Sequence, residues 1–323
     1  MAGIDQALLA DIGGTNARFA RLDRNGIGSI ERLKVADHAS AELAIGEVVA
    51  RHDVAADRAA AIIAVAGPVE NGRAVLTNSN WQFDTAELKR EFGFRTVHLL
   101  NDFEAQAWSL PALGAADLFQ LGGKAAVAGA PMVVAGPGTG FGTACLVTNG
   151  TSRLALVTEA GHATLPVVSE REAAVIGHLR RQFGHVSIER VMSGPGLENL
   201  YRALAAVDGA DVPERDAASI TSRALDGSCS ASRAALETFC GLLGTVCGNL
   251  ALTFAARGGL YIAGGIAPRM ADFLANSAFR ERFDAKGRFQ DYLREVPVNI
   301  VMRPDAGFLG LKTFLETNVV AGS

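Results

Sequence analysis

The chain has 323 residues, of which 49% are hydrophobic and 20% charged, which is enough material for two globular cores. The formal net charge is -4 and Lys and Arg form no run longer than a pair, so a nucleic-acid or anionic-membrane footprint is excluded. The four cysteines show neither a CxxC pair nor histidines at zinc-finger spacing, which predicts free thiols in the reducing cytoplasm. Residues 1–6 contain no basic residue, so we expect no signal peptide.

The first predicted element is a glycine hairpin near the N-terminus. Residues 8–12 and 17–22 read as strands on either side of a turn made of Gly13, Gly14, Thr15 and Asn16. Amides of such a turn can converge on phosphate oxygens, the Thr15 hydroxyl can donate another hydrogen bond, and Asp11 can hold Mg²⁺ directly or through water. Taken alone, the segment slightly favours an ordinary Gly-Gly hairpin with Asn16 as a turn residue.

Two buried strands are predicted next, at residues 60–66 and 96–100, and the second leads into a helix over 102–113. Asp102 stands where the apolar strand passes into this helix. A carboxylate at that position can accept a proton from a substrate hydroxyl during in-line phosphoryl transfer, or it can simply cap the helix. The adjacent Asn101 can likewise hydrogen-bond sugar hydroxyls or cap.

A second glycine hairpin is predicted in the other half of the chain. Strands at 132–135 and 141–147 flank a turn that contains Gly136, Gly138, Thr139 and Gly140. A strand rather than a helix follows the turn, which disfavours a Rossmann dinucleotide site, and the chain has no P-loop motif. Two glycine hairpins could instead clamp a polyphosphate from opposite sides.

A polar group follows the second hairpin. Glu159 and His162 stand in an otherwise apolar stretch, and Glu189 comes later in the chain; paired acceptors of this kind suit sugar hydroxyls. The other interpretations are a core histidine at His162, an exposed Glu189 paired with Arg190, and a metal pair of Glu159 with His162 that lacks further ligands.

Helices alternate with strands in the remainder. The helical pattern recurs at five places, namely 170–183, 197–206, 217–224, 231–254 and 271–283. A strand at 259–263 precedes Gly264 and Gly265, which form either a ledge for an adenosine or a tight turn. The uncharged run 239–256 reaches the lower limit for a membrane span, but its small residues favour a buried helix, so we expect no membrane association. The alternation predicts an α/β fold with mixed sheets.

Six segments, taken together and in order, resemble the bacterial glucokinase family of the sugar-kinase, heat-shock ATPase and actin superfamily. The resemblance runs from Leu8 to about Leu311. Each motif alone is weak, but six in order are specific. The segments are LLADIGGTNARFA, LLNDFEAQAW, VVAGPGTGFGTA, TEAGHATLP, IERVMSGPGLENLY and GGLYIAGGIAPR.

The resemblance implies a two-domain actin-like ATPase fold, which is ribonuclease-H-like, with an interdomain cleft. It places a small domain at 1–110 plus 302–323 and a large domain at 111–301. It further implies transfer of the γ-phosphoryl group of ATP to the primary hydroxyl of glucose, with Mg²⁺ and with Asp102 as general base. Sugar ligands would be Asn101, Glu159, His162 and Glu189; phosphate ligands Gly13, Gly14, Thr15, Gly138 and Thr139; and Gly264 and Gly265 would flank the adenosine.

The resemblance also bears on metals and partners. A related family of repressors and kinases carries a cysteine-rich zinc motif after its sugar-binding histidine, and this chain lacks it, so we expect no structural zinc. The first predicted strand begins within ten residues of Met1, which leaves no room there for a DNA-binding helix-turn-helix. The family implies a homodimer. Two other functions stay open: a kinase for fructose, mannose or an N-acetylhexosamine, and an actin-like or sugar-sensing protein that binds nucleotide without sugar chemistry.

Overall fold

The computed structural model describes residues 6–76 and 79–320. The chain divides into two compact units: unit 1 is Met1–Leu113 with Pro304–Ser323, and unit 2 is Gly114–Arg303. The domains expected from the resemblance have boundaries that differ from these by a few residues. The expectation of no signal peptide concerns residues 1–6, of which residues 1–5 lie outside the described residues.

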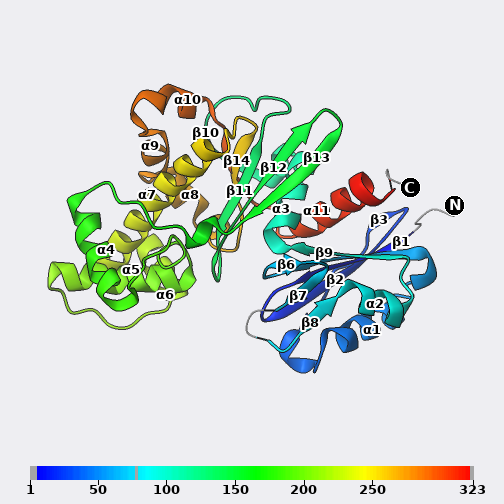
Figure 1. Ribbon diagram of the computed structural model, residues 1–323. Helices are drawn as coiled ribbons and strands as arrows, with labels where there is room; N and C mark the ends of the chain where they lie inside the picture. The colour runs from blue at the N-terminus through cyan, green and yellow to red at the C-terminus, as the bar shows by residue number, and fades with distance from the viewer. Residues whose placement is uncertain (1–5, 77–78, 321–323) are drawn as a thin grey trace. The chain divides into compact units, whose positions relative to one another are not determined.

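Unit 1 is built on a mixed six-stranded sheet (Figure 1). Strand β1 pairs antiparallel with β2 and parallel with β5, which in turn pairs parallel with β9. A small antiparallel sheet of β6, β7 and β8 accompanies it. The strands are β1 Gln6–Ile12, β2 Asn16–Asp23, β3 Gly26–Ile27, β4 Glu31–Lys34, β5 Ala59–Val65, β6 Val69–Glu70, β7 Arg73–Val75, β8 Gln82–Asp84 and β9 Thr96–Asn101.

Helices cover both faces of this sheet, and the alternation along β1 shows how. Leu8 and Ile12 belong to the hydrophobic cluster that contains residues of α1 (Ala41–Arg51) and α2 (Thr85–Phe92). Leu9 belongs to the cluster with α3 (Asp102–Ser109) and α11 (Ala306–Phe314). Since side chains alternate along a strand, Asp11 faces the same side as Leu9, toward α3 and α11.

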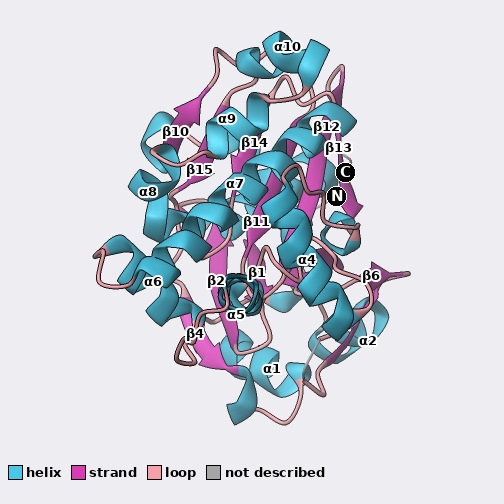
Figure 2. Cartoon of the chain, turned by 90° about the vertical axis from the view of Figure 1, so that its left-hand side faces the viewer, coloured by secondary structure: helices cyan, strands magenta, loops and turns pink. Residues whose placement is uncertain are grey.

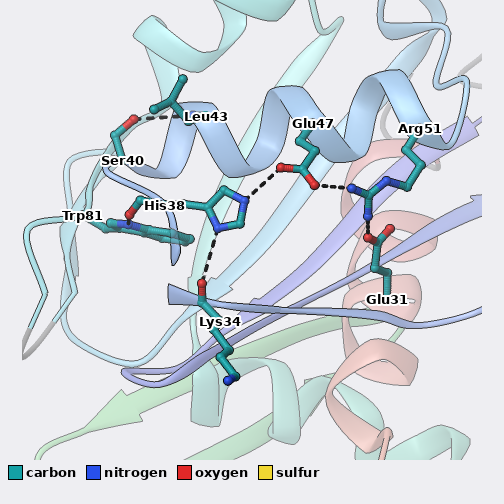
Figure 3. Close-up of polar contacts among 8 residues, drawn as sticks. All are labelled: Glu31, Lys34, His38, Ser40, Leu43, Glu47, Arg51 and Trp81. Carbon is teal, nitrogen blue, oxygen red and sulfur yellow. Dashed lines mark hydrogen bonds and ion pairs between the residues drawn. The ribbon is translucent and has the colours of Figure 1, made fainter. Parts of the chain in front are cut away.

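A chain of polar contacts fastens α1 to β4 and to the residue before β8 (Figure 3). Arg51 forms ion pairs with Glu31 of β4 and with Glu47, and Glu47 also contacts His38 Nε2 at 2.9 Å. The Trp81 indole N–H donates to the His38 carbonyl at 3.1 Å. These contacts join three separate segments of unit 1.

Unit 2 is built on a second mixed six-stranded sheet, with the order β10-β15-β14-β11-β12-β13. Figure 2 shows helices of this unit in front of its strands, and its core joins side chains of β11, β12, β14 and β15 to those helices. The strands are β10 Leu118–Gly122, β11 Met132–Pro137, β12 Phe141–Asn149, β13 Ser152–Thr158, β14 Gly259–Ile262 and β15 Val298–Val301. The helices are α4 Glu170–Phe183, α5 Gly194–Asp208, α6 Ala217–Leu225, α7 Ser230–Thr253, α8 Ala271–Ala275, α9 Phe279–Asp284 and α10 Gln290–Glu295.

Helix α7 contains most of the uncharged run singled out in the sequence. It is long and apolar enough to cross a membrane by length and composition, yet 78% of its most apolar window is buried within the protein. Gly244 and Gly248 explain the close packing, because an added Cβ would lie 2.2 Å and 2.5 Å from carbonyl oxygens of Phe279 and Phe283 in α9. The helix therefore has the burial of a core helix.

The structure confirms both predicted glycine hairpins, β1–β2 and β11–β12, as antiparallel pairs. Two predicted helices were wrong in extent. The helix expected over 102–113 ends at Ser109 and passes into a 3₁₀ turn at Leu110–Ala112, which contains Pro111. The helix expected over 271–283 is two helices, α8 and α9, with Asn276 at the C-cap of α8. The four cysteines are free, and three of them are buried.

Candidate active site

Asn101 and Asp102 lie at the junction of β9 and α3 in unit 1. Asn101, not Asp102, is the N-cap: its Oδ1 accepts from the amides of Phe103 and Glu104 at 2.9 and 3.3 Å, and Glu104 completes a capping box. The interpretation of Asp102 as the cap was therefore wrong. Asp102 is the first residue of α3, where its Oδ1 accepts from the Phe103 amide at 2.9 Å. Capping needs Asn101 and leaves the Asp102 carboxylate available for chemistry.

The electrostatic environment of Asp102 favours its neutral form. Desolvation by burial is the main cause, and the negative charge of Asp11 adds to it, so that the pKa of Asp102 rises from 3.8 to about 6. The hydrogen bond from the Phe103 amide opposes this shift in part. A carboxyl group with this pKa is ionised at neutral pH but holds a proton more readily than an ordinary aspartate does, as a general base must.

The Asn101 side chain is engaged within the protein. Its Nδ2 donates a hydrogen bond to the Gly67 carbonyl at 3.0 Å, and its Oδ1 serves the cap. The side chain also forms a hydrogen bond with Asp102, which opposes in part the rise in the pKa of that residue. Asn101 is therefore a cap that also holds its neighbour, and its contact with a sugar hydroxyl stays a prediction.

Asp11, near the end of β1, forms an ion pair with Arg18, the residue directly opposite it on the neighbouring strand β2. Arg18 is held in place by a second hydrogen bond, from Nη1 to the Pro304 carbonyl at 3.2 Å, and its guanidinium lies over the Phe308 ring. The contact to Arg18 uses Oδ2 of Asp11. Sequence reasoning missed Arg18, although an acid and a base facing each other across a predicted hairpin would have signalled it.

The turn after Asp11 presents few of its groups to the protein itself. The Gly13 amide donates to the Asn16 carbonyl at 3.0 Å and closes the turn. Gly14, Thr15 and Asn16 are exposed, and an added Cβ at Gly13 would come no closer than 3.7 Å to another atom. The Gly13 amide is therefore used within the turn, whereas Gly14 and Thr15 lie in its exposed part.

The corresponding turn of unit 2 is closed in the same way. The Gly138 amide donates to the Gly140 carbonyl at 2.8 Å, and the Gly138 carbonyl accepts from Gly194, the first residue of α5, at 2.9 Å. Thr139 is exposed, and an added Cβ at Gly138 would meet nothing within 4 Å. The N-terminus of α5 thus lies beside this turn, where its dipole favours negative charge. Sequence reasoning gave no such role to Gly194.

Gly136 and Gly264 are required by packing. A Cβ at Gly136 would lie 2.3 Å from the Ala263 carbonyl oxygen, and one at Gly264 would lie 2.5 Å from the Pro137 carbonyl oxygen. Gly264 also has φ +86°, a backbone conformation that favours glycine. Both glycines are exposed, but an added Cβ at Gly265 would meet nothing within 4 Å, so Gly265 is the glycine of this pair that offers an open ledge.

Glu189 is held against the glycine turn of unit 2. Its Oε2 accepts from the Phe141 amide at 3.0 Å, and its own amide donates to the Gly161 carbonyl at 2.9 Å. Arg190 stacks over the Phe183 ring instead of pairing with Glu189 within the described part of the chain. The interpretation of Glu189 as an exposed partner of Arg190 was therefore wrong.

Glu159 and His162 bracket a 3₁₀ turn, Ala160–His162, directly after β13. Both side chains are open to solvent, with exposed fractions of 70% and 63%, and His162 Nε2 lies 3.7 Å from Glu159 Oε2. A core histidine is excluded by this exposure. Gly161 between them is buried, and a Cβ there would lie 2.2 Å from the Phe141 carbonyl oxygen. The structure thus brings Glu159, His162 and Glu189 together around one short turn.

Asp11 is the acidic residue that the sequence suggested as a magnesium ligand. Among residues 6–76 and 79–320, no group of three or more His, Cys, Asp or Glu side chains could hold a metal ion. Asp11 offers a single carboxylate, which suits an ion held mainly by substrate phosphates and water. Among the described residues, Glu159 and His162 have no third His, Cys, Asp or Glu beside them with which to form a metal site. The absence of structural zinc stays a prediction.

The chain matches known proteins along nearly all of its length. The family model described as Glucokinase matches residues 8–318. A glucokinase of Paramagnetospirillum magneticum is 44% identical over 94% of this chain and 95% of its own length, and one of Nitrobacter hamburgensis is 42% identical over 94% and 95%.

A solved structure of glucokinase from an Antarctic psychrotroph superposes with a TM-score of 0.88 at 39% identity, over 97% of this chain and 99% of that one. The α/β class with mixed sheets and the actin-like ATPase fold are therefore as expected. The chain belongs to the glucokinase family.

Proposed function

We propose that this enzyme transfers the γ-phosphoryl group of ATP to the primary hydroxyl of glucose, with Asp102 as the general base. The observation that carries this assignment is the state of the Asp102 carboxylate. Asn101 caps the helix, so Asp102 does not have to, and burial together with Asp11 raises the pKa of Asp102 to about 6. Membership of the glucokinase family, with curated relatives at 44% and 42% identity, supports glucose as the sugar.

In this mechanism Asp102 accepts the hydroxyl proton while the sugar oxygen attacks the γ-phosphorus. The oxygen–phosphorus bond forms as the bond to the bridging oxygen of ADP breaks. The exposed Glu159 and His162, the Oε1 of Glu189 and the side chain of Asn101 would hold the other sugar hydroxyls. Most of the acceleration comes from such positioning.

The phosphates would be bound by groups that the protein leaves unused. These are the amides of Gly14 and Thr15 in unit 1 and Thr139 in unit 2, each of them exposed. Mg²⁺, bound mainly by the phosphates with Asp11 beside it, would supply neutralisation of their charge. Gly265 would lie along the adenosine. The homodimer and the cytoplasmic location stay predictions.

A hexose panel with coupled detection of ADP tests this assignment. We expect kcat/KM for glucose to exceed that for fructose, mannose and N-acetylglucosamine by about tenfold or more, because a site with matched polar groups rejects misplaced hydroxyls. A higher value for another hexose would reassign the substrate. No ADP release with any sugar would overturn the kinase assignment.

A further inference from the structure

We propose that Gly140 is a positioning residue for the sugar, because the missing side chain at residue 140 leaves the space in which the Glu189 carboxylate lies. The inference deepens the proposed function and rests on it, since it takes Glu189 as a ligand of a sugar hydroxyl. It gives Gly140 a different role from the phosphate contact expected from the sequence.

The space at residue 140 is already filled by Glu189. A Cβ built on Gly140 would lie 2.4 Å from Glu189 Oε2 and 3.2 Å from its Cδ. Carbon and oxygen atoms that are not bonded do not approach to this distance, so any residue other than glycine must displace the carboxylate. The neighbouring Phe141 amide donates to the same Oε2 at 3.0 Å. The turn therefore both makes room for the carboxylate and fixes its direction.

The main chains of both partners are held in place, so the Glu189 side chain is the part that would move. The main chain of Glu189 is held on both sides, by its own amide on the Gly161 carbonyl at 2.9 Å and by the Ser193 hydroxyl on its carbonyl at 2.8 Å. The carbonyl of Gly140 accepts from the Gly138 amide at 2.8 Å. A side chain at residue 140 would thus be accommodated by rotating Glu189, which breaks its bond to the Phe141 amide.

The geometry has a consequence for binding. With Oε2 held by the Phe141 amide, Oε1 is the oxygen left to accept from a sugar hydroxyl. A carboxylate whose direction is already fixed loses less side-chain entropy when the sugar binds. The same turn carries Thr139, a proposed phosphate contact. The sugar ligand and the phosphate turn are consequently parts of one hydrogen-bonded unit.

Gly177 provides a control, because it lies in α4, outside the proposed binding turns, and its added Cβ would meet nothing within 4 Å. Glucose binding is measured by calorimetry without nucleotide in the parent, in Gly140→Ala and in Gly177→Ala. We expect Gly140→Ala to weaken glucose affinity about tenfold or more, and Gly177→Ala to leave it within about twofold. Equal glucose affinity in the parent and Gly140→Ala would overturn the proposal.

A second comparison separates positioning from a purely structural effect. In a Glu189→Ala background the obstacle is gone, so adding Gly140→Ala should cost no further glucose affinity and little further thermal stability. If Gly140→Ala alone does not fold, the proposal requires the double variant to fold. The proposal is refuted if the loss of glucose affinity in the double variant equals the sum of the losses in the two single variants. A parent that binds no glucose would instead refute the proposed function, and the stability comparison would still test the contact.

Discussion

Replacing Asp102 by Asn is expected to make the protein more stable and far less active. The amide keeps the shape of the carboxyl group but cannot accept the hydroxyl proton. We therefore expect kcat to fall by about 10² to 10⁴, the usual contribution of a positioned base, with the KM for ATP little changed. Helix α3 keeps its cap because the cap is Asn101.

The gain in stability follows from the shifted pKa. A rise from 3.8 to about 6 is roughly 2 units, which corresponds to about 3 kcal/mol at most. Because the pKa of Asp102 is higher in the folded state, its contribution to stability is complete below pH about 4 and is lost as the pH rises through about 6. Asn does not ionise. At pH 7.5 the variant should be more stable than the parent by about 1 to 3 kcal/mol, and at pH 4 the two should be equal.

Two measurements check this prediction. Turnover is followed by coupled ADP detection at pH 7.5, and unfolding by denaturant titration at pH 4 and pH 7.5. Near-normal turnover in a folded Asp102→Asn protein would refute the role as base. A stability difference that is the same at both pH values would refute the argument from desolvation.

The other predictions concern the remaining parts of the protein. Gly138→Val should raise the KM for ATP far more than that for glucose, because a branched side chain would project into the open side of the phosphate turn; equal increases would remove the turn from the nucleotide site. Glu159→Ala or His162→Ala should weaken glucose binding by about 1 to 3 kcal/mol in calorimetry, and unchanged affinity would exclude the residue as a ligand. The hydrogen bond with Glu47 raises the pKa of His38 above its ordinary value of 6.5. The stabilisation from protonated His38 is therefore complete below pH about 6.5 and is lost as the pH rises through the raised pKa. A Tm series in pH should accordingly be flatter in His38→Gln, and parallel curves would contradict this. Treatment with a zinc chelator should leave the far-UV circular dichroism unchanged.

The local features of the site could be predicted from the sequence because they depend on neighbouring residues. Each hairpin combines two apolar strands with a glycine turn, so both are visible in a short window. Asp102 could be placed at a strand–helix junction for the same reason. The sequence could not show whether Asn101 or Asp102 caps the helix. Asn and Asp are equally good caps, and the choice depends on the strand that precedes them.

The roles of individual glycines could not be predicted, because they depend on what lies opposite in the fold. Gly264 and Gly265 are the same residue in adjacent positions, yet only Gly264 contacts the Pro137 carbonyl. The contact of Gly140 with Glu189 joins segments that are far apart in the sequence. Helix α11 was missed as well.

The central claim, phosphoryl transfer to the primary hydroxyl of glucose, is tested most directly by the product itself. The purified protein is incubated with ATP, Mg²⁺ and uniformly ¹³C-labelled glucose, and the product is examined by ¹³C and ³¹P NMR. We expect a single phosphate ester whose phosphorus couples to carbon 6, and its formation should be lost in Asp102→Asn. An ester at any other carbon, or release of ADP with no sugar phosphate, would contradict this account.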